Sequence, residues 1–235
     1  MSGPRIAVIG DGKMGRAVAQ LAGDAGLVVT AVIGRADNTK GARVTRAAIG
    51  DADVAIEFTE PAAAVDNVRA CLRAGCPVVV GTTGWYHELD DIVPLVKESG
   101  AALLYAPNFS IGANILWQAA EYMATLAARA GGFDAHIIEV HHNQKKDAPS
   151  GTAAELGKRA SAALGRAVPI TSVRVGSVPG THQLILDGTF EQLTIEHVAR
   201  DRRVFAEGAI AAARWLVGKR GVFTMRDVLS PGTAP

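Results

Sequence analysis

The stretch RIAVIGDGKMGRAVAQLAGDAG, residues 5–26, decides the fold. It opens with a short apolar run, passes through a glycine-rich turn and continues directly into a helix-like pattern. Four further apolar runs rich in Val, Ile and Leu follow at residues 27–34, 53–59, 77–83 and 102–107. Runs without strict alternation are typical of parallel strands that are covered on both faces. Because helix-like segments ending near glycines separate them, this part of the chain predicts a doubly wound parallel sheet.

The glycine turn, Gly10 to Gly15, reads GDGKMG and matches the pattern G-x-G-x-x-G. It follows a strand and opens a helix, which is the context in which this motif binds the pyrophosphate of a dinucleotide. The glycines let the backbone approach the phosphates, and the helix N-terminus offers N–H groups and the positive end of its dipole. A plain tight turn is the alternative reading. We expect a dinucleotide-binding site.

The end of the second strand indicates which dinucleotide is used. An Asp or Glu for the ribose hydroxyls of NAD normally lies there, but this chain has Gly34 and Arg35. The missing carboxylate and the adjacent guanidinium favour a 2′-phosphate, so we expect NADPH as the preferred cofactor. Asp37 is close enough in the sequence to support NADH as well. Two more strand ends, FTEP (58–61) and GTTG (81–84), leave room for the nicotinamide, unless they are ordinary turns.

The composition is that of an ordinary globular protein, with 49% hydrophobic residues and a formal net charge of +1. Such a charge gives no indication of nucleic-acid or membrane partners, since these would need a strongly basic surface. Cys71 and Cys76 are expected to be free buried thiols of a reducing cytosol, because a structural zinc needs four ligands. No signal peptide or membrane-spanning run is visible, and we expect a cytoplasmic protein.

The pattern changes after Asn108. A long helix is predicted over residues 113–130, then a strand at 136–142 and a helix at 152–164. Three segments with clearer alternation follow at 170–176, 182–188 and 191–200, and indicate a mixed or antiparallel sheet with one wet face. The chain closes with an alanine-rich helix and a short tail. We therefore expect a second domain of different architecture.

The run EVHHNQKKDAPSGTA, residues 139–153, is unusual in this alanine-rich and valine-rich chain. Two histidines precede two lysines, and like charges this close repel, so stability does not explain the cluster. Ser150 or Thr152 can cap the following helix, and Thr152 with Glu155 has capping-box spacing. A helix start also attracts anions, and histidine is the usual proton donor near neutral pH. The run therefore predicts a pocket for a carboxylate-bearing ligand with a proton-transfer group.

This run resembles the signature of the 4-hydroxy-tetrahydrodipicolinate reductase family, also called dihydrodipicolinate reductases. The likeness extends to FTEP, GTTG, APNFSIGAN (106–114) and the closing FAEGAIAAARWLVGKRGVFTMRDVL (205–229), and so covers essentially the whole chain. It implies an α/β fold with an N-terminal Rossmann-type dinucleotide-binding domain and an α+β substrate and oligomerisation domain with a mixed sheet. The expected boundaries are 1–108, 109–202 and a C-terminal return to the first domain at 203–235.

The resemblance implies reduction of a cyclic, unsaturated dicarboxylate by NADPH or NADH with release of water, in lysine biosynthesis through diaminopimelate. It also implies a homotetramer built through the substrate-domain sheets. By motif, His141 is the proton donor and acceptor and Lys145 a second proton donor. The substrate carboxylates fall to His142, Ser150, Gly151 and Thr152. The cofactor contacts fall to Gly10, Asp11, Gly12, Lys13, Met14, Gly15, Arg35, Phe58, Gly81, Thr82, Thr83, Ala106, Pro107, Asn108, Phe109, Arg202 and Phe205.

Gly34 stands where the family frequently has an acidic residue, and the glycine turn is one residue shorter than the commoner family form. No metal is expected, since His141 and His142 are adjacent on a strand and point to opposite faces. The other histidines, at 87, 136, 182 and 197, are expected to be core or surface residues. Alternative functions are a reductase of another imino acid, such as an aspartate-dehydrogenase-like enzyme, a non-catalytic dinucleotide sensor, or a purely structural oligomer.

Overall fold

The computed structural model describes residues 3–36 and 38–230, so Asp37 lies outside the described residues. The chain forms two compact units. The first unit consists of residues 1–110 together with 203–235, and the second unit is the continuous segment 111–202. Each unit has its own sheet and its own core.

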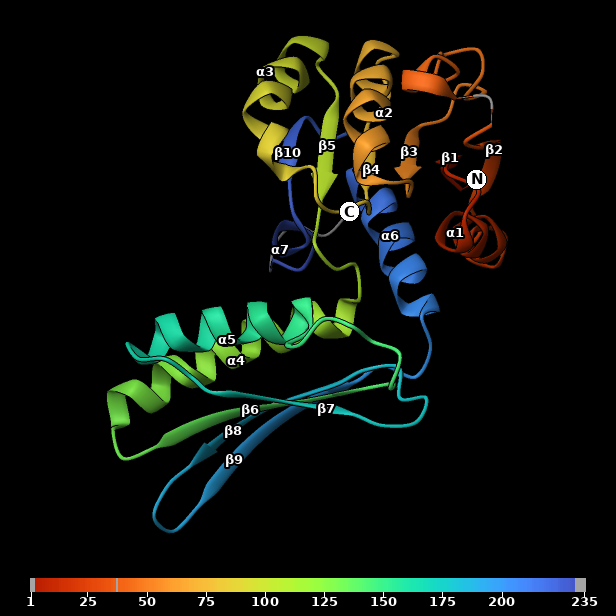
Figure 1. The fold of residues 1–235 in the computed structure, drawn as a ribbon. Helices are drawn as coiled ribbons and strands as arrows, with labels where there is room; N and C mark the ends of the chain where they lie inside the picture. The colour runs from red at the N-terminus through yellow and green to blue at the C-terminus, as the bar shows by residue number, and fades with distance from the viewer. Residues whose placement is uncertain (1–2, 37, 231–235) are drawn as a thin grey trace. The chain divides into compact units, whose positions relative to one another are not determined.

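The first unit is built on a six-stranded sheet in the order β10-β5-β4-β3-β1-β2, in which every pairing is parallel (Figure 1). The central strands are buried on both faces, which explains their unbroken apolar runs. The prediction of a doubly wound parallel sheet is therefore confirmed. The strands are β1 (Arg5–Ile9), β2 (Val28–Ile33), β3 (Val54–Glu57), β4 (Val78–Val80), β5 (Ala102–Tyr105) and β10 (Gly221–Phe223).

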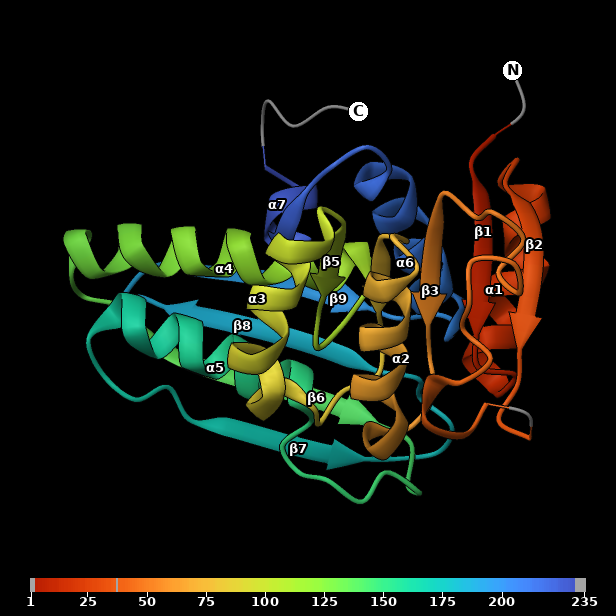
Figure 2. The same ribbon diagram turned by 90° about the horizontal axis from the view of Figure 1, so that it is seen from above.

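Helices cover both faces of this sheet (Figure 2). On one face α2 (Pro61–Arg73) and α3 (Leu89–Ser99) bury side chains such as Val68 and Ile92 in the core. On the other face α6 (Arg203–Leu216) packs against β3, β4 and α1 (Lys13–Asp24). A Cβ at Gly208 would lie 1.7 Å from the carbonyl oxygen of Phe109. Only glycine at this position therefore lets α6 pack so closely against the backbone at Phe109. The short elements are η1 (Thr39–Gly41), η2 (Tyr86–Glu88) and α7 (Met225–Val228).

The segment expected to be a short tail contains a strand. Residues Gly221 to Phe223 pair in parallel with Ala102 to Leu104 and form β10, at the edge of the sheet beside β5. A run of three residues is too short to show a period in the sequence, so this strand could not be recognised there. The first sheet is thus completed by residues near the end of the chain.

The second unit has a four-stranded sheet in the order β7-β6-β8-β9. The β6–β7 pairing is parallel and the other two are antiparallel, so the predicted mixed sheet is confirmed. Two helices lie on one face of it and enclose a core that includes Trp117, Ile137, Leu156 and Leu184 (Figure 1). The elements are α4 (Ile111–Ala130), β6 (Asp134–His141), α5 (Gly151–Leu164), β7 (Ile170–Arg174), β8 (Thr181–Asp187) and β9 (Gln192–Val198).

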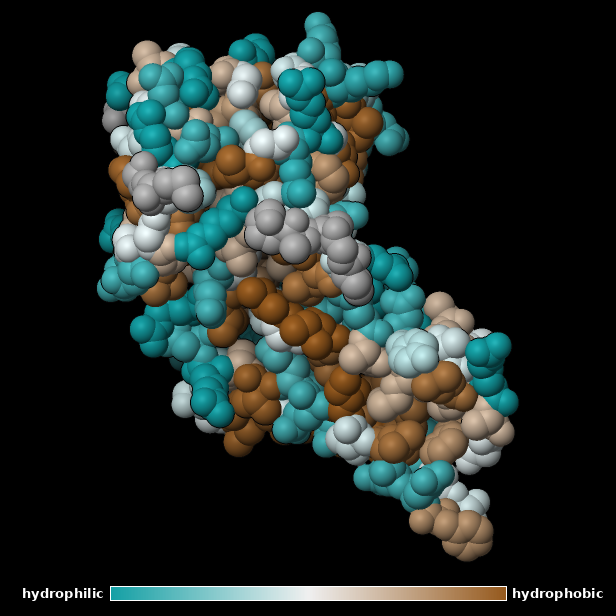
Figure 3. All heavy atoms as spheres, turned by 180° about the vertical axis from the view of Figure 1, so that it is seen from behind, coloured by the Kyte–Doolittle hydropathy of each residue, from teal (hydrophilic) through white to brown (hydrophobic). Residues whose placement is uncertain are grey.

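The opposite face of this sheet stays open within the described part of the unit. It carries the half-buried Ile138 and Ile185 and the exposed Val173 and Val198. Apolar side chains also gather along α4, where Ile115 is 53% exposed (Figure 3). The second unit therefore presents apolar surface that its own elements leave uncovered. Among the described helices, none combines the length and the apolar character that crossing a membrane requires.

Candidate active site

The glycine turn of the first unit has the geometry of a phosphate-binding turn. Gly10 has φ +110°, and a Cβ there would lie 2.0 Å from the carbonyl oxygen of Phe58. A Cβ at Gly15 would lie 1.9 Å from the carbonyl oxygen of Gly10, so glycine lets α1 pack against the turn. A Cβ at Gly12 would meet nothing within 4 Å. The first glycine makes the turn, the third permits close packing, and the second leaves the backbone open to a ligand.

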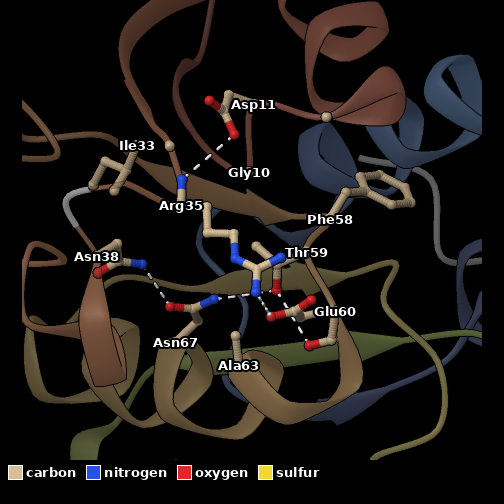
Figure 4. Close-up of a pocket in the computed structure, with 12 residues that line it drawn as sticks. Gly10, Asp11, Ile33, Arg35, Asn38, Phe58, Thr59, Glu60, Ala63 and Asn67 are labelled. Atoms are coloured by element: carbon tan, nitrogen blue, oxygen red, sulfur yellow. Dashed lines mark hydrogen bonds and ion pairs between the residues drawn. The ribbon is translucent and has the colours of Figure 1, made fainter.

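A cavity of about 210 Å³ opens beside this turn, at the carboxyl ends of β1, β2 and β3 (Figure 4). Because β2 and β3 flank β1 on opposite sides, this is the topological switch point, where open α/β sheets bind their ligands. The cavity is lined by Gly10, Asp11, Gly12, Ile33, Gly34, Arg35, Asn38, Phe58, Thr59, Glu60, Ala63 and Asn67. An adjoining cavity of about 340 Å³ is lined by Gly12, Lys13, Met14, Phe58, Thr59, Pro61, Gly81, Thr82 and Thr83.

Most of the residues expected to contact the cofactor line these two cavities together. The segment 106–109 follows β5 and is absent from the described lining of both, although the Phe109 ring meets Phe58 edge-on at 6.1 Å between centroids. Phe205 lies in α6. Arg202 belongs to the second unit, where it lines a different cavity together with His142. The cofactor role of these outlying residues stays a prediction.

A buried polar network supports the floor of the first cavity. Glu57 at the end of β3 is fully buried, accepts a hydrogen bond from the Thr59 hydroxyl and lies 3.4 Å from the amide nitrogen of Asn67. Asn38 in turn donates to the amide oxygen of Asn67 at 2.8 Å. Burial raises the pKa of Glu57, and the hydrogen bonds only partly oppose this. No motif in the sequence predicts this network; its one signal there is a carboxylate inside the apolar run VAIEF, residues 54–58.

The second unit contains a buried charge network around His141, the last residue of β6. The Glu139 carboxylate is fully buried and is hydrogen-bonded through one oxygen to Nδ1 of His141. Its other oxygen accepts from Arg174 Nη2 at 2.7 Å and from the Ser150 N–H at 3.3 Å. Burial favours the neutral acid, but hydrogen bonds from Arg174, Ser172 and His141 outweigh it and lower the pKa of Glu139 to about 2. Glu139 is therefore ionised at neutral pH.

This carboxylate decides which nitrogen of His141 can exchange protons. An ionised carboxylate only accepts hydrogen bonds, so Nδ1 carries a proton and Nε2 is the reactive nitrogen. A Cβ at Gly180 would lie 3.0 Å from Nε2, so glycine keeps side-chain atoms away from that nitrogen. Burial lowers the pKa of His141; Glu139 opposes the shift, and the charges of Lys145 and Arg174 add to it. The imidazole is thus neutral at pH 7 and is a stronger acid than ordinary histidine once protonated.

Ser150 connects this network to the start of α5. Its hydroxyl oxygen accepts from the Ala153 N–H at 3.2 Å and lies 3.0 Å from Nε2 of His182. Ser150 is therefore the N-cap, and the capping box expected from Thr152 is wrong because Thr152 lies inside the first turn of α5. His182 is a core residue as expected. Burial, with the charges of His141 and His197, lowers the pKa of His182 to about 3 and keeps it neutral.

Positive groups gather around the loop between β6 and α5. The Lys145 ammonium is held by the two oxygens of Asp147 at 2.8 and 2.9 Å. A cavity of about 600 Å³ opens beside His142 and is also lined by Arg200 and Arg202. The N-terminus of α5, with Gly151 and Thr152 in its first turn, adds the positive end of a helix dipole. Together these groups can receive an anionic ligand.

Glu139, His141 and His182 also place one potential metal-ligating atom each within 4.8 Å of one another. These groups are engaged in other contacts, however: Glu139 binds His141 and Arg174, and His182 binds Ser150. A guanidinium beside the carboxylate repels a further cation. The arrangement is that of a proton-transfer histidine and its carboxylate partner.

A parallel-sheet unit with a glycine turn at its switch point, and a second unit with a histidine prepared for proton transfer, define a dinucleotide-dependent oxidoreductase. The family model described as "Dihydrodipicolinate reductase, N-terminus" matches residues 4–109, and the one described as "Dihydrodipicolinate reductase, C-terminus" matches residues 112–229. The chain belongs to the dihydrodipicolinate reductase family. The predicted family, fold class and enzyme class are therefore confirmed.

Individual relatives are similar to this chain over most of its length. The 4-hydroxy-tetrahydrodipicolinate reductase of Thiobacillus denitrificans is 34% identical, with 96% of this chain and 98% of that protein covered. That of Christiangramia forsetii is 37% identical, covering 76% of this chain and 80% of its own length. A dipicolinate-bound dihydrodipicolinate reductase from Paenisporosarcina sp. TG-14 superposes with a TM-score of 0.82 at 23% identity, covering 97% of this chain and 100% of that one. This last likeness shows the shared fold.

Arg174→Met removes the cation that faces the buried Glu139. Breaking a buried ion pair from one side costs about 3–5 kcal/mol. The free energy of unfolding, measured with urea at pH 7, should therefore be lower in the variant by about that amount. The pKa of Glu139, about 2, lies below its ordinary 4.5, so the stability from its ionised form is present above pH 4.5 and is lost as the pH falls toward 2. The difference in the free energy of unfolding between wild type and variant should therefore become smaller as the pH falls from 4.5 toward 2.

The matched control is Arg166→Met. Arg166 pairs with Asp134 on the surface at 3.1 Å, where an ion pair contributes little. Equal losses for the two variants would contradict the importance given to the Glu139 network.

Proposed function

We propose that the two units divide the work of one reduction, the first binding the dinucleotide and the second binding the substrate and moving protons. The reaction is the NAD(P)H-dependent reduction of 4-hydroxy-tetrahydrodipicolinate to tetrahydrodipicolinate with loss of water, in lysine biosynthesis through diaminopimelate. Family membership carries this assignment, and the His141–Glu139 network is the observation that connects it to chemistry. A cytoplasmic location stays a prediction.

The residues of the first unit fit the cofactor, because the turn at Gly12 leaves its backbone open at the N-terminus of α1. The bound dinucleotide supplies the hydride. NADPH is the preferred form in this proposal, since Arg35 lines the switch-point cavity and offers a guanidinium for the 2′-phosphate. Lys13 and Thr83 line the adjoining cavity and are assigned to the rest of the cofactor.

In the second unit His141 supplies the proton. Addition of a hydride to a conjugated imine leaves an enamine, which must take a proton on a neighbouring carbon. Nε2 of His141 can supply it, since Nδ1 is held by Glu139. Glu139 holds the ring in one tautomer and orientation. Lys145 is assigned as a second proton donor, and its ion pair with Asp147 must open for that role.

The substrate is a dicarboxylate, and the second unit offers two kinds of group for it. His142 and Arg200 line the 600 Å³ cavity, where the arginine can bind a carboxylate by charge and the histidine by a hydrogen bond. Ser150, Gly151 and Thr152 at the start of α5 are assigned to the other carboxylate, on the positive end of the helix dipole.

The test of the function is a coupled assay with purified protein. The preceding synthase makes the substrate in place from pyruvate and aspartate semialdehyde, and absorbance follows the oxidation of NADPH or NADH. We expect oxidation with both, at higher kcat/KM with NADPH. Binding of a dinucleotide without any oxidation would contradict the reaction and favour a sensor or another imino-acid substrate. Equal efficiencies, or a preference for NADH, would contradict the role of Arg35.

Glu139→Gln tests how His141 works. If protonated His141 is the acid, kcat/KM falls as the pH rises through its pKa, which burial places below the ordinary 6.5. The Glu139 charge raises that pKa, so its removal lowers it and should move the falling limb to lower pH by about one unit or more. Glutamine can still accept from Nδ1, but the variant also breaks the ion pair with Arg174 and is less stable, so the profiles are compared under conditions where circular dichroism shows both proteins folded.

The comparison variant is His141→Gln, which should lose about 10²- to 10⁴-fold in kcat and the pH limb with it. A Glu139→Gln profile that overlays the wild type would show that the carboxylate does not act through His141. His87→Gln, at an exposed histidine of the first unit, serves as the unaffected histidine control.

We also propose a homotetramer assembled through the open sheet face of the second unit, supported by the uncovered apolar side chains there. Sedimentation equilibrium should give four chains per particle, and Val173→Glu should reduce that number because it puts a charge on the buried surface. Val32→Glu, at an exposed position of the first unit, is the control. A monomeric wild type would contradict the proposal.

A further inference from the structure

The end of β2 has no acidic residue of its own, yet a carboxylate lies there. It comes from Asp11 in the glycine turn. Its Oδ1 accepts a long hydrogen bond, 3.4 Å, from the backbone N–H of Arg35 (Figure 4). A Cβ at Gly34 would lie 2.7 Å from the other oxygen of Asp11. The Asp11 carboxylate therefore fills the space that a side chain at residue 34 would take.

The backbone of Asp11 is also fixed. Its carbonyl oxygen accepts a hydrogen bond of 2.8 Å from Nε of Arg16, one turn into α1. The exposed Asp11 side chain lines the same cavity as Ile33, the last residue of β2, and Arg35, which follows the strand. In dinucleotide sites a carboxylate at this place accepts hydrogen bonds from the ribose hydroxyls of NAD, and it repels a 2′-phosphate. Asp11 has the charge, the reach and the position for both effects.

The guanidinium expected to meet the 2′-phosphate already has a partner. Nη2 of Arg35 lies 3.1 Å from Oε1 of Glu60, which precedes the first residue of α2. Figure 4 shows the Arg35 side chain extending across the cavity to reach it. The two side chains are 83% and 46% exposed, and ion pairs so open to solvent contribute little. A 2′-phosphate, with up to two charges, can displace Glu60 but must compete with it.

We propose that Asp11 and Glu60 together set the choice between NADH and NADPH: Asp11 supplies from the glycine turn the ribose-binding carboxylate that β2 lacks, and Glu60 limits the NADPH preference by holding Arg35. This rests on the dinucleotide site proposed above. It explains how one cavity serves both cofactors. Arg35 favours NADPH. Asp11 favours NADH, and Glu60 competes with the 2′-phosphate for the arginine.

The experiment measures the dissociation constants of NAD⁺ and NADP⁺ by isothermal titration calorimetry, at one fixed ionic strength, on the full-length protein. Asp11→Asn should weaken NAD⁺ binding about tenfold, the effect of losing hydrogen bonds to a charged acceptor, and should tighten NADP⁺ binding by removing a like charge. Glu60→Gln should tighten NADP⁺ binding a few-fold and change NAD⁺ binding much less.

Two controls separate the local effect from a general change in charge. Asp24→Asn removes an exposed carboxylate near the far end of α1, and Glu98→Gln removes one on α3. A relocation variant, Asp11→Ser with Gly34→Asp, moves the carboxylate to the end of β2, where serine leaves room for it. It should return NAD⁺ affinity toward the wild-type value and so show that the position of the charge matters.

The outcomes are distinct. Wild-type protein that binds neither dinucleotide would overturn the proposed cofactor site and this inference with it. Wild-type protein that binds both, with an Asp11→Asn ratio of NADP⁺ to NAD⁺ affinity equal to that of Asp24→Asn, would overturn only the inference. A relocation variant that stays at the Asp11→Asn level would likewise count against Asp11 as the ribose carboxylate.

Discussion

The second unit depends on one buried carboxylate. Glu139 is fully buried, and an ion taken out of water is tolerated only where partners surround it. Those partners come from three directions: His141 on the same strand, Arg174 on β7, and the backbone N–H of Ser150 at the start of α5. The need to satisfy Glu139 therefore joins a sheet, a helix start and an imidazole at one point. The proton-transfer geometry of His141 follows from this requirement.

The two units treat a buried glutamate in opposite ways. In the first unit Glu57 is surrounded by the neutral Thr59 and Asn67, and burial raises its pKa. In the second, the guanidinium of Arg174 lies against Glu139, and the pKa falls to about 2. Both side chains are inaccessible to solvent, but only Glu139 has a cationic partner, whose hydrogen bond helps to outweigh the effect of burial. The ionised Glu139 suits the support of an imidazole, because its charge holds the proton on Nδ1 of His141.

The parallel sheet and the glycine turn of the first unit could be predicted from the sequence, because the first has a recurring apolar pattern and the second follows a motif. The apolar runs of β1, β3 and β4 indicate burial on both faces of the sheet. The glycine at residue 10 indicates the tight turn of a phosphate-binding loop. The contacts between distant residues could not be predicted. Arg174 is 35 residues from Glu139, and no local period connects them. Asp11 and Gly34 are a similar case, since the aspartate of the glycine turn fills the space of the side chain that Gly34 lacks after β2.

The return of the chain to the first unit has a consequence for synthesis on the ribosome. The residues before α4 can pair five of the six strands, but one sheet face lacks α6 and the edge of β5 lacks β10 until the last part of the chain emerges. The continuous segment 111–202 is complete earlier. Domains fold as units while the chain is being made, at about 5–20 residues per second. The N-terminal half of the dinucleotide site is therefore made first, but its unit is finished last.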